Sequence, residues 1–165
     1  MRESRNKKLP LSEFEDPLSN YDPPKYTDPM EAALIEQPVA AIQSRPFAAV
    51  PPDLPIHEAM AALVGLEIGC LLISANERLL GVFTERDVLD KLAGRYPTMR
   101  DRPVSEVMTP KPVFVYETDS AAAALSVMAV SGFRHVPVLD TDDKVVGIVS
   151  PQRVTAFLKT HFEAG

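Results

Sequence analysis

The same short stretch occurs twice in this sequence. Gly81–Asp87 and Gly147–Arg153 each carry an apolar strand end into a hydroxyl residue and then into a helical pattern. The apolar stretches upstream, Leu71–Ile73 and Val136–Val138, repeat at nearly the same spacing as the two glycines. An internal repeat of this kind predicts two copies of one small unit that bury their apolar faces against each other.

Composition narrows the class of protein. The chain has 165 residues with 45% hydrophobic content, which is enough for a packed core. A net charge of −6 argues against nucleic-acid binding as the main role. The one cysteine, Cys70, excludes an internal disulfide and fits a reducing cytoplasm. We see no secretion signal and no apolar run long enough to span a membrane, so we expect a cytoplasmic protein without membrane contact.

Apolar runs and caps predict the order β-α-β-β-α in each unit, with continuous apolar strands that are covered on both faces. In the first unit we expect strands at 47–50, 70–73 and 79–83 and helices from 53 or 54 to about 68 and over 85–93. In the second we expect a helical lead-in at 104–108, strands at 113–115, 136–139 and 144–149, and helices at 120–131, capped by Asp119, and 151–162.

The N-terminal region, residues 1–37, is predicted to be an arm. Ten of the 16 prolines lie between Pro10 and Pro55, which excludes long regular elements there. Asp28 and Pro29 predict the start of a short helix near 29–36. Two alternatives stay open for the rest of the arm: a solvated tail, or docking of Phe14, Tyr21 and Tyr26 onto the domain or a second subunit.

Thr84 and Asp87 have two interpretations from the residues alone. Thr84 is a natural N-cap, and Asp87 stands at the capping-box position, so the pair can simply start a helix. The alternative, a role beyond capping, depends on the second copy of the stretch at Gly147–Arg153.

The ordered fragments Gly81–Asp87, Val107–Pro110, Gly132–Asp140 and Gly147–Ser150 resemble the CBS-domain family, as a tandem pair over about residues 38–162. The resemblance implies a mixed α/β fold in which two β-α-β-β-α motifs pack sheet to sheet about a pseudo-twofold axis. Motif 1 would span 38–98 and motif 2 would span 99–165.

In that family, clefts between the motifs bind adenine nucleotides or adenosine derivatives and signal occupancy to a partner. By resemblance, Asp87 and Thr84 would hold the ribose in a first cleft. Adenine contacts, phosphate contacts and other cleft positions would come from Val82, Arg86, Thr109, Pro110, Lys111, Phe133 and His135.

The second cleft departs from the family pattern. Ile148 and Ser150 match it, and Arg134 resembles a phosphate-facing position, but Arg153 replaces the ribose carboxylate. An arginine cannot accept a hydrogen bond. We therefore expect one good site and one degenerate site, which is either empty or holds an anion.

We expect a non-enzymatic regulatory module, because no catalytic grouping and no metal-ligand spacing is visible. The ligand would be AMP-, ADP- or ATP-like, with Mg²⁺ left open as its companion. By resemblance, we expect a homodimer through the helical faces and an unidentified regulated protein. The alternative is a ligand-free module that only dimerises and serves as a scaffold.

Overall fold

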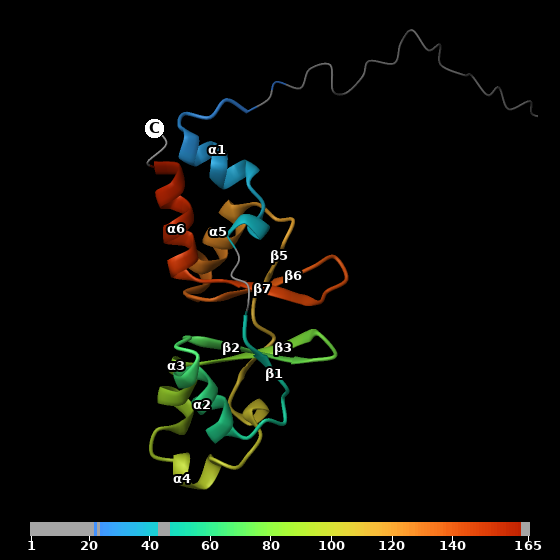
Figure 1. Cartoon of the computed structure of the whole chain (residues 1–165), viewed down its shortest axis with the longest axis vertical. Helices are drawn as coiled ribbons and strands as arrows, with labels where there is room; N and C mark the ends of the chain where they lie inside the picture. The colour runs from blue at the N-terminus through green and yellow to red at the C-terminus, as the bar shows by residue number, and fades with distance from the viewer. Residues whose placement is uncertain (1–21, 23, 43–46, 163–165) are drawn as a thin grey trace, which may run out of the picture.

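The structure, a computed structural model, describes residues 22, 24–42 and 47–162. Two units are stacked, each with a small sheet facing the other and helices on its outer side (Figure 1). The first sheet has the order β1-β2-β3-β4 and the second β5-β6-β7. The predicted mixed α/β pair of repeats is confirmed. The strands are β1 Ala49–Val50, β2 Cys70–Ala75, β3 Arg78–Thr84, β4 Thr109–Pro110, β5 Val115–Tyr116, β6 Val136–Leu139 and β7 Val145–Val149.

Helices cover the outer side of each sheet (Figure 1). The first unit carries α2 Ile56–Gly65, the one-turn α3 Glu85–Asp87, the π-helical turn η3 Val88–Leu92 and α4 Tyr96–Met99. The second carries α5 Ala121–Ser131 and α6 Pro151–Phe162, and α1 Pro29–Glu36 packs against both of them. Two short 3₁₀ helices, η2 Val39–Ala41 and η4 Val104–Glu106, precede the two repeats.

Alternation along the strands explains why their sequences are apolar throughout. In β2, Leu71 and Ile73 face the helices of the first unit, whereas Cys70 and Leu72 face the other sheet. The sheet-to-sheet cluster is completed from the second unit, where Val145 and Ile148 pack against it. Because both faces of β2 are covered, neither set of side chains needs to be polar.

The short segment that precedes each unit packs against the other unit. Val39 N donates to the Asp119 carbonyl at 2.7 Å, and Val104 N donates to the Leu54 carbonyl at 2.8 Å. Val39 is accordingly buried in the core of the second unit and Val104 in the core of the first. This reciprocal packing ties the two halves together beyond the contact of their sheets.

The predicted helix caps are mostly confirmed. Asp28 caps α1 by accepting from Glu31 N, and Thr84 caps α3 by accepting from Asp87 N. Asp119 as the cap of α5 is wrong: Ser120 caps the helix, while the Asp119 carboxylate accepts from Tyr116 N at 2.8 Å. Either residue type can cap a helix, and the turn after β5 captures the aspartate instead.

Several boundaries also differ from prediction. The helix expected from 53 or 54 begins at Ile56, and the single helix expected over 85–93 is α3 followed by a π-helical turn. Neither α4 nor β4 was expected. In the predicted arm, the helix at 29–36 is confirmed and Tyr26 is half-buried. Phe14 and Tyr21 lie outside the described residues.

Candidate functional site

A cleft of about 1000 Å³ opens between the two units, and we call it the waist cleft. Its walls include Phe47, Gly69 and Cys70 from the first unit and Arg134, Ile148 and Ser150 from the second. These residues lie at or near the ends of strands from both sheets. The cleft is therefore at the boundary between the two sheets. It is lined by both repeats, so occupancy can affect how they pack.

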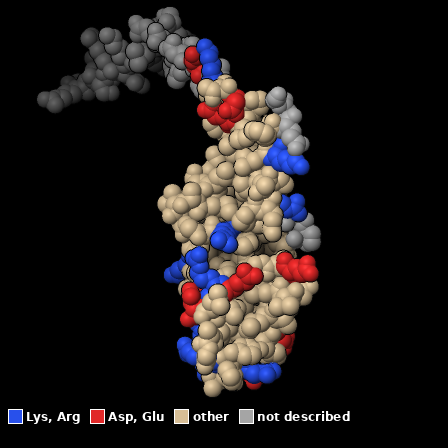
Figure 2. Space-filling view, turned by 90° about the vertical axis from the view of Figure 1, so that its left-hand side faces the viewer, with Lys and Arg blue, Asp and Glu red and all other residues tan. Residues whose placement is uncertain are grey.

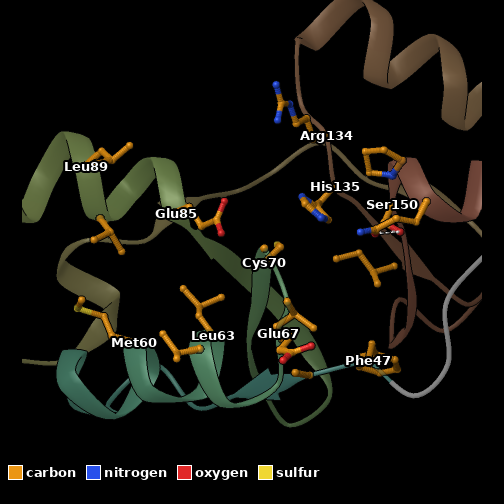
Figure 3. Close-up of a pocket in the computed structure, with 18 residues that line it drawn as sticks. Phe47, Met60, Leu63, Glu67, Cys70, Glu85, Leu89, Arg134, His135 and Ser150 are labelled. Carbon is orange, nitrogen blue, oxygen red and sulfur yellow. Dashed lines mark hydrogen bonds between the residues drawn. The ribbon is translucent and has the colours of Figure 1, made fainter.

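One side of the waist cleft carries nitrogen donors and a hydroxyl. Figure 3 shows Arg134, His135 and Ser150 grouped there, opposite the helices of the first unit. Arg134 and His135 immediately precede β6, and Ser150 follows β7. The Ser150 hydroxyl is buried and lies 3.4 Å from Gln152 Oε1, a long hydrogen bond that a ligand can replace.

Two carboxylates, Glu67 and Glu85, also line the waist cleft. Figure 3 shows them on either side of Cys70. Glu67 follows α2 in a left-handed conformation with a φ of 52°, and Glu85 is the first residue of α3. At the surface, basic and acidic side chains stand side by side at the level where the units meet (Figure 2).

The helical end of the waist cleft is apolar. Met60, Leu63 and Val64 of α2 face Val88 and Leu89 of the π-helical turn. Figure 3 shows Met60, Leu63 and Leu89 on the side away from Arg134. The cleft can therefore hold a ligand with a polar part and an apolar part, as small-molecule sites commonly do.

The ring of His135 is held against the first repeat. A Cβ at Gly69 would lie 3.0 Å from His135 Cε1, so the ring lies where a larger residue would have its side chain. Burial lowers the pKa of His135, and the neighbouring Arg134 lowers it further, while Glu85 opposes them. The imidazole is therefore neutral at pH 7, able both to donate and to accept.

Cys70 lines the same cleft without being a nucleophile. Burial raises the pKa of its thiol to about 12, with a smaller contribution from Asp87. Since only the thiolate reacts, this thiol is a packing residue.

Asp87 is engaged by protein groups on both oxygens. Oδ2 accepts from Thr84 N at 2.9 Å and Thr84 Oγ1 at 2.8 Å. Oδ1 accepts from Lys91 Nζ at 2.6 Å and Thr109 Oγ1 at 2.7 Å. These four bonds fill the four or so acceptor positions of a carboxylate, so none is left for a ribose hydroxyl in this arrangement.

The same contacts set the charge state of Asp87. Burial acts to raise the pKa of Asp87, but the hydrogen bonds from Lys91, Thr109 and Thr84 outweigh it and hold the pKa below its ordinary value. Asp87 N also donates to Thr84 Oγ1 at 3.4 Å, which completes the capping box that the sequence predicts. Both carboxylate oxygens of Asp87 are thus held within the protein, away from the waist cleft.

The other predicted residues of the first cleft are dispersed. Val82 is buried between the sheets, and Pro110 pairs with Gly81 in β4. Arg86 is exposed on α3, and Phe133 is half-buried ahead of Arg134. Lys111 borders a separate hollow of about 410 Å³ beside Phe114. Of this predicted set, His135 lines the waist cleft.

The waist cleft instead contains most of the residues predicted for the second site. Arg134, Ile148 and Ser150 all line it, and Arg153 is exposed in the first turn of α6. Sequence reasoning did not identify Glu67, Glu85 and Phe47 as lining residues. The internal repeat did contain one indication of this site. At the positions where the second unit has Arg134 and His135, the first unit has Gly69 and Cys70.

Two further properties hold for the part of the chain that the structure describes. It contains no group of three or more His, Cys, Asp or Glu side chains placed to hold a metal ion. None of its helices combines the length and apolar character that a bilayer crossing requires.

The sequence matches a family model described as CBS domain twice, at residues 39–94 and 104–160. A CBS domain-containing protein of Arabidopsis thaliana, CBSCBSPB5, is 33% identical over 97 residues. That match covers 58% of this chain and 18% of the relative, so the chain spans a small part of the curated protein.

Solved structures share the fold. A CBS domain protein from Pyrobaculum aerophilum complexed with AMP superposes with a TM-score of 0.67 at 25% identity, covering 76% of this chain and 98% of the other. The CBS domain pair of protein MJ0100, in complex with 5′-methylthioadenosine and S-adenosyl-L-methionine, gives a TM-score of 0.65 at 26% identity, covering 73% and 98%.

Proposed function

Because this chain belongs to the CBS-domain family, we propose that it is a regulatory module that binds an adenosine-containing ligand in the waist cleft. The observation that carries the proposal is the cleft itself, which is open, lined by both repeats and equipped with Arg134, His135 and Ser150. Similar CBS pairs are described in complex with AMP or with 5′-methylthioadenosine and S-adenosyl-L-methionine.

The walls of the cleft suit the parts of such a ligand. Phe47 and Ile148 offer apolar surface for the base. The Ser150 hydroxyl and the Glu67 and Glu85 carboxylates offer contacts to ribose hydroxyls. Arg134 is the cation for a monophosphate, if the ligand carries one.

Binding in the waist cleft would couple the ligand to the arrangement of the two repeats. A ligand that contacts Ser150 and Glu85 together bridges the residue before α6 and the first residue of α3, which belong to different units. A ligand shifts an equilibrium by its differential affinity for two states. We propose that a partner protein reads this change in packing, without catalysis by the chain itself.

The ligand could bind in the waist cleft or in the first cleft that the family resemblance predicts, and variants of each cleft should affect its affinity differently. Calorimetry with adenosine, AMP, ATP and 5′-methylthioadenosine measures that affinity. We expect Ser150→Ala to weaken binding of the ligands that bind by about 1 kcal/mol through loss of one hydrogen bond. Ser105→Ala, at an exposed position in η4, is the matched control. Weakening by Thr109→Ala but not by Ser150→Ala would move the ligand to Asp87, and no heat with any ligand would refute the proposal.

The ligand-free scaffold is the second candidate, and the four hydrogen bonds that Asp87 accepts from the protein favour it. It requires that no adenosine ligand changes the thermal midpoint. The same panel of ligands therefore separates the two functions.

We also propose a cytoplasmic homodimer through the helical face of the first unit. Val64 and Leu89 are 78% and 71% exposed there, close to the mouth of the waist cleft. Light scattering should give twice the chain mass for the parent protein and the single mass for Leu89→Glu. Equal masses for the two proteins would contradict an interface at this face.

A further inference from the structure

The charges that line the waist cleft limit which adenosine derivative fits it. Glu67 and Glu85 contribute two negative charges, and Arg134 contributes one positive charge. His135 adds none at neutral pH, because burial and Arg134 lower its pKa. The lining side chains that the structure describes therefore carry a net charge of −1.

Among residues 24–42 and 47–162, which the structure describes, neighbouring cations do not reverse this balance. Arg86 and Arg153 are exposed and are not part of the cleft wall. Lys91 directs its ammonium to Asp87 and to the Val107 and Met108 carbonyls. Lys111 borders the other hollow.

A polyphosphate is poorly matched to such a wall. Tight binding of phosphates in proteins depends on several charge-assisted donors, most often from arginine and lysine. Of the lining residues in the described part of the chain, Arg134 alone carries a permanent positive charge, and each additional phosphate would face the two carboxylates. Repulsion between like charges in a half-enclosed site is stronger than in bulk water.

The opposite end of the cleft favours a different 5′ substituent. Beyond Glu85 the cleft continues between Leu63 of α2 and Leu89 of the π-helical turn, with Met60 alongside. An apolar thioether chain would be buried there, whereas a phosphate chain would lose its hydration without gaining a donor. A positively charged group near the start of this channel would meet Glu67 and Glu85.

We infer that the waist cleft selects adenosine derivatives whose 5′ substituent is apolar or positively charged, and discriminates against the di- and triphosphates. The inference rests on the proposed function, since it names the ligand class for the same cleft. It sets an order of affinity: 5′-methylthioadenosine above AMP, and AMP above ATP. The repulsive element is the carboxylate pair, and the attractive element is the apolar channel.

The test is calorimetry of the full chain with 5′-methylthioadenosine, AMP and ATP at constant ionic strength, without magnesium. We expect 5′-methylthioadenosine to bind at least about tenfold more tightly than ATP, because ATP brings several negative charges towards the two carboxylates. The Glu85→Gln and Glu67→Gln variants should each strengthen ATP binding and lower the preference for 5′-methylthioadenosine over ATP, because the amide keeps an oxygen acceptor for the ribose but carries no charge. Glu106→Gln, an exposed carboxylate in η4, is the control and should change neither affinity.

The outcomes separate this inference from the function on which it rests. ATP binding at least as tightly as 5′-methylthioadenosine to the parent protein would overturn the inference while leaving an adenosine-binding module. Unchanged ATP affinity in both glutamine variants would also overturn it, because the carboxylates would then not be the repelling groups. Binding of none of the three ligands would remove the proposed function as well.

Discussion

Lys91 Nζ lies 2.6 Å from Asp87 Oδ1, and the same ammonium donates to the carbonyls of Val107 at 2.8 Å and Met108 at 3.0 Å. One side chain thereby joins the π-helical turn of the first unit to the segment that leads into the second. The Asp87 side chain is 5% exposed and that of Lys91 36% exposed. The contact between Lys91 and Asp87 thus holds together two segments that are distant in sequence. It also occupies the Asp87 carboxylate, to which the family resemblance assigns ribose binding.

Lys91→Met should destabilise the protein by about 2 kcal/mol, because it leaves a buried carboxylate and two carbonyls without their shared donor. Chemical denaturation measures the loss. Arg102→Met is the matched control, since Arg102 and Glu106 form an exposed pair with the same spacing and should contribute under about 0.5 kcal/mol. Equal effects of the two variants would mean that the Lys91 contacts contribute no more than a surface pair.

The lowered pKa of Asp87 predicts how its contribution depends on acidity. The folded-state pKa lies below the unfolded value of about 3.9, so the unfolded chain binds more protons between the two values. The stabilisation is complete above the unfolded pKa and is lost as the pH falls through the folded pKa. Urea unfolding should therefore show the parent more stable than Asp87→Asn at pH 6, with a difference that shrinks towards pH 3. A difference independent of pH would contradict the ionic role of this carboxylate.

Gly81→Ala should destabilise the protein, because β4 approaches this glycine closely. An added Cβ would lie 2.5 Å from Met108 Sδ and 2.9 Å from the Thr109 carbonyl oxygen. The methionine can move, but the carbonyl belongs to the backbone of β4, so we expect a cost of about 1–3 kcal/mol. Gly65→Ala, where a Cβ would meet nothing within 4 Å, should be neutral or slightly stabilising in the same denaturation assay. A neutral Gly81→Ala would show that β4 can move aside freely.

The repeat made the architecture predictable, and the local patterns made most elements predictable. Continuous apolar runs identified β2, β3, β6 and β7, whose side chains belong to the cores of the two units or to the cluster between the sheets. The cap at Thr84 was visible because it depends on residues three apart. What failed locally was the choice between two adjacent capping residues, Asp119 and Ser120, which the turn after β5 decides.

Long-range partners explain why the candidate site was harder to predict. Lys91 stands four residues after Asp87, but its other acceptors, Val107 and Met108, come from the lead-in to the second unit. The local sequence around Glu67 and Glu85 also does not mark them as site residues, because the wall that they face, with Arg134 and His135, comes from the second unit. A family pattern assigns positions to a cleft, but the charges around them are particular to this chain.

The ring of His135, which lies against Gly69 in the waist cleft, should make stability depend on pH near neutrality. Burial is the largest cause and lowers its pKa, Glu85 opposes burial, and Arg134 adds a smaller lowering. The unfolded chain therefore protonates this histidine near pH 6.5 and the folded chain only at lower pH, so between these values the unfolded state binds more protons. Stability from this site is present above about pH 6.5 and is lost as the pH falls through the folded pKa.

His135→Gln should therefore reduce the loss of unfolding free energy between pH 7.5 and 5.5 by a fraction of a kcal/mol. Proton NMR titration of the His135 ring gives the folded pKa directly. A folded pKa at or above 6.5 would mean that the ring is hydrated and protonated, which would return a positive charge to the cleft wall and weaken the case against phosphorylated ligands.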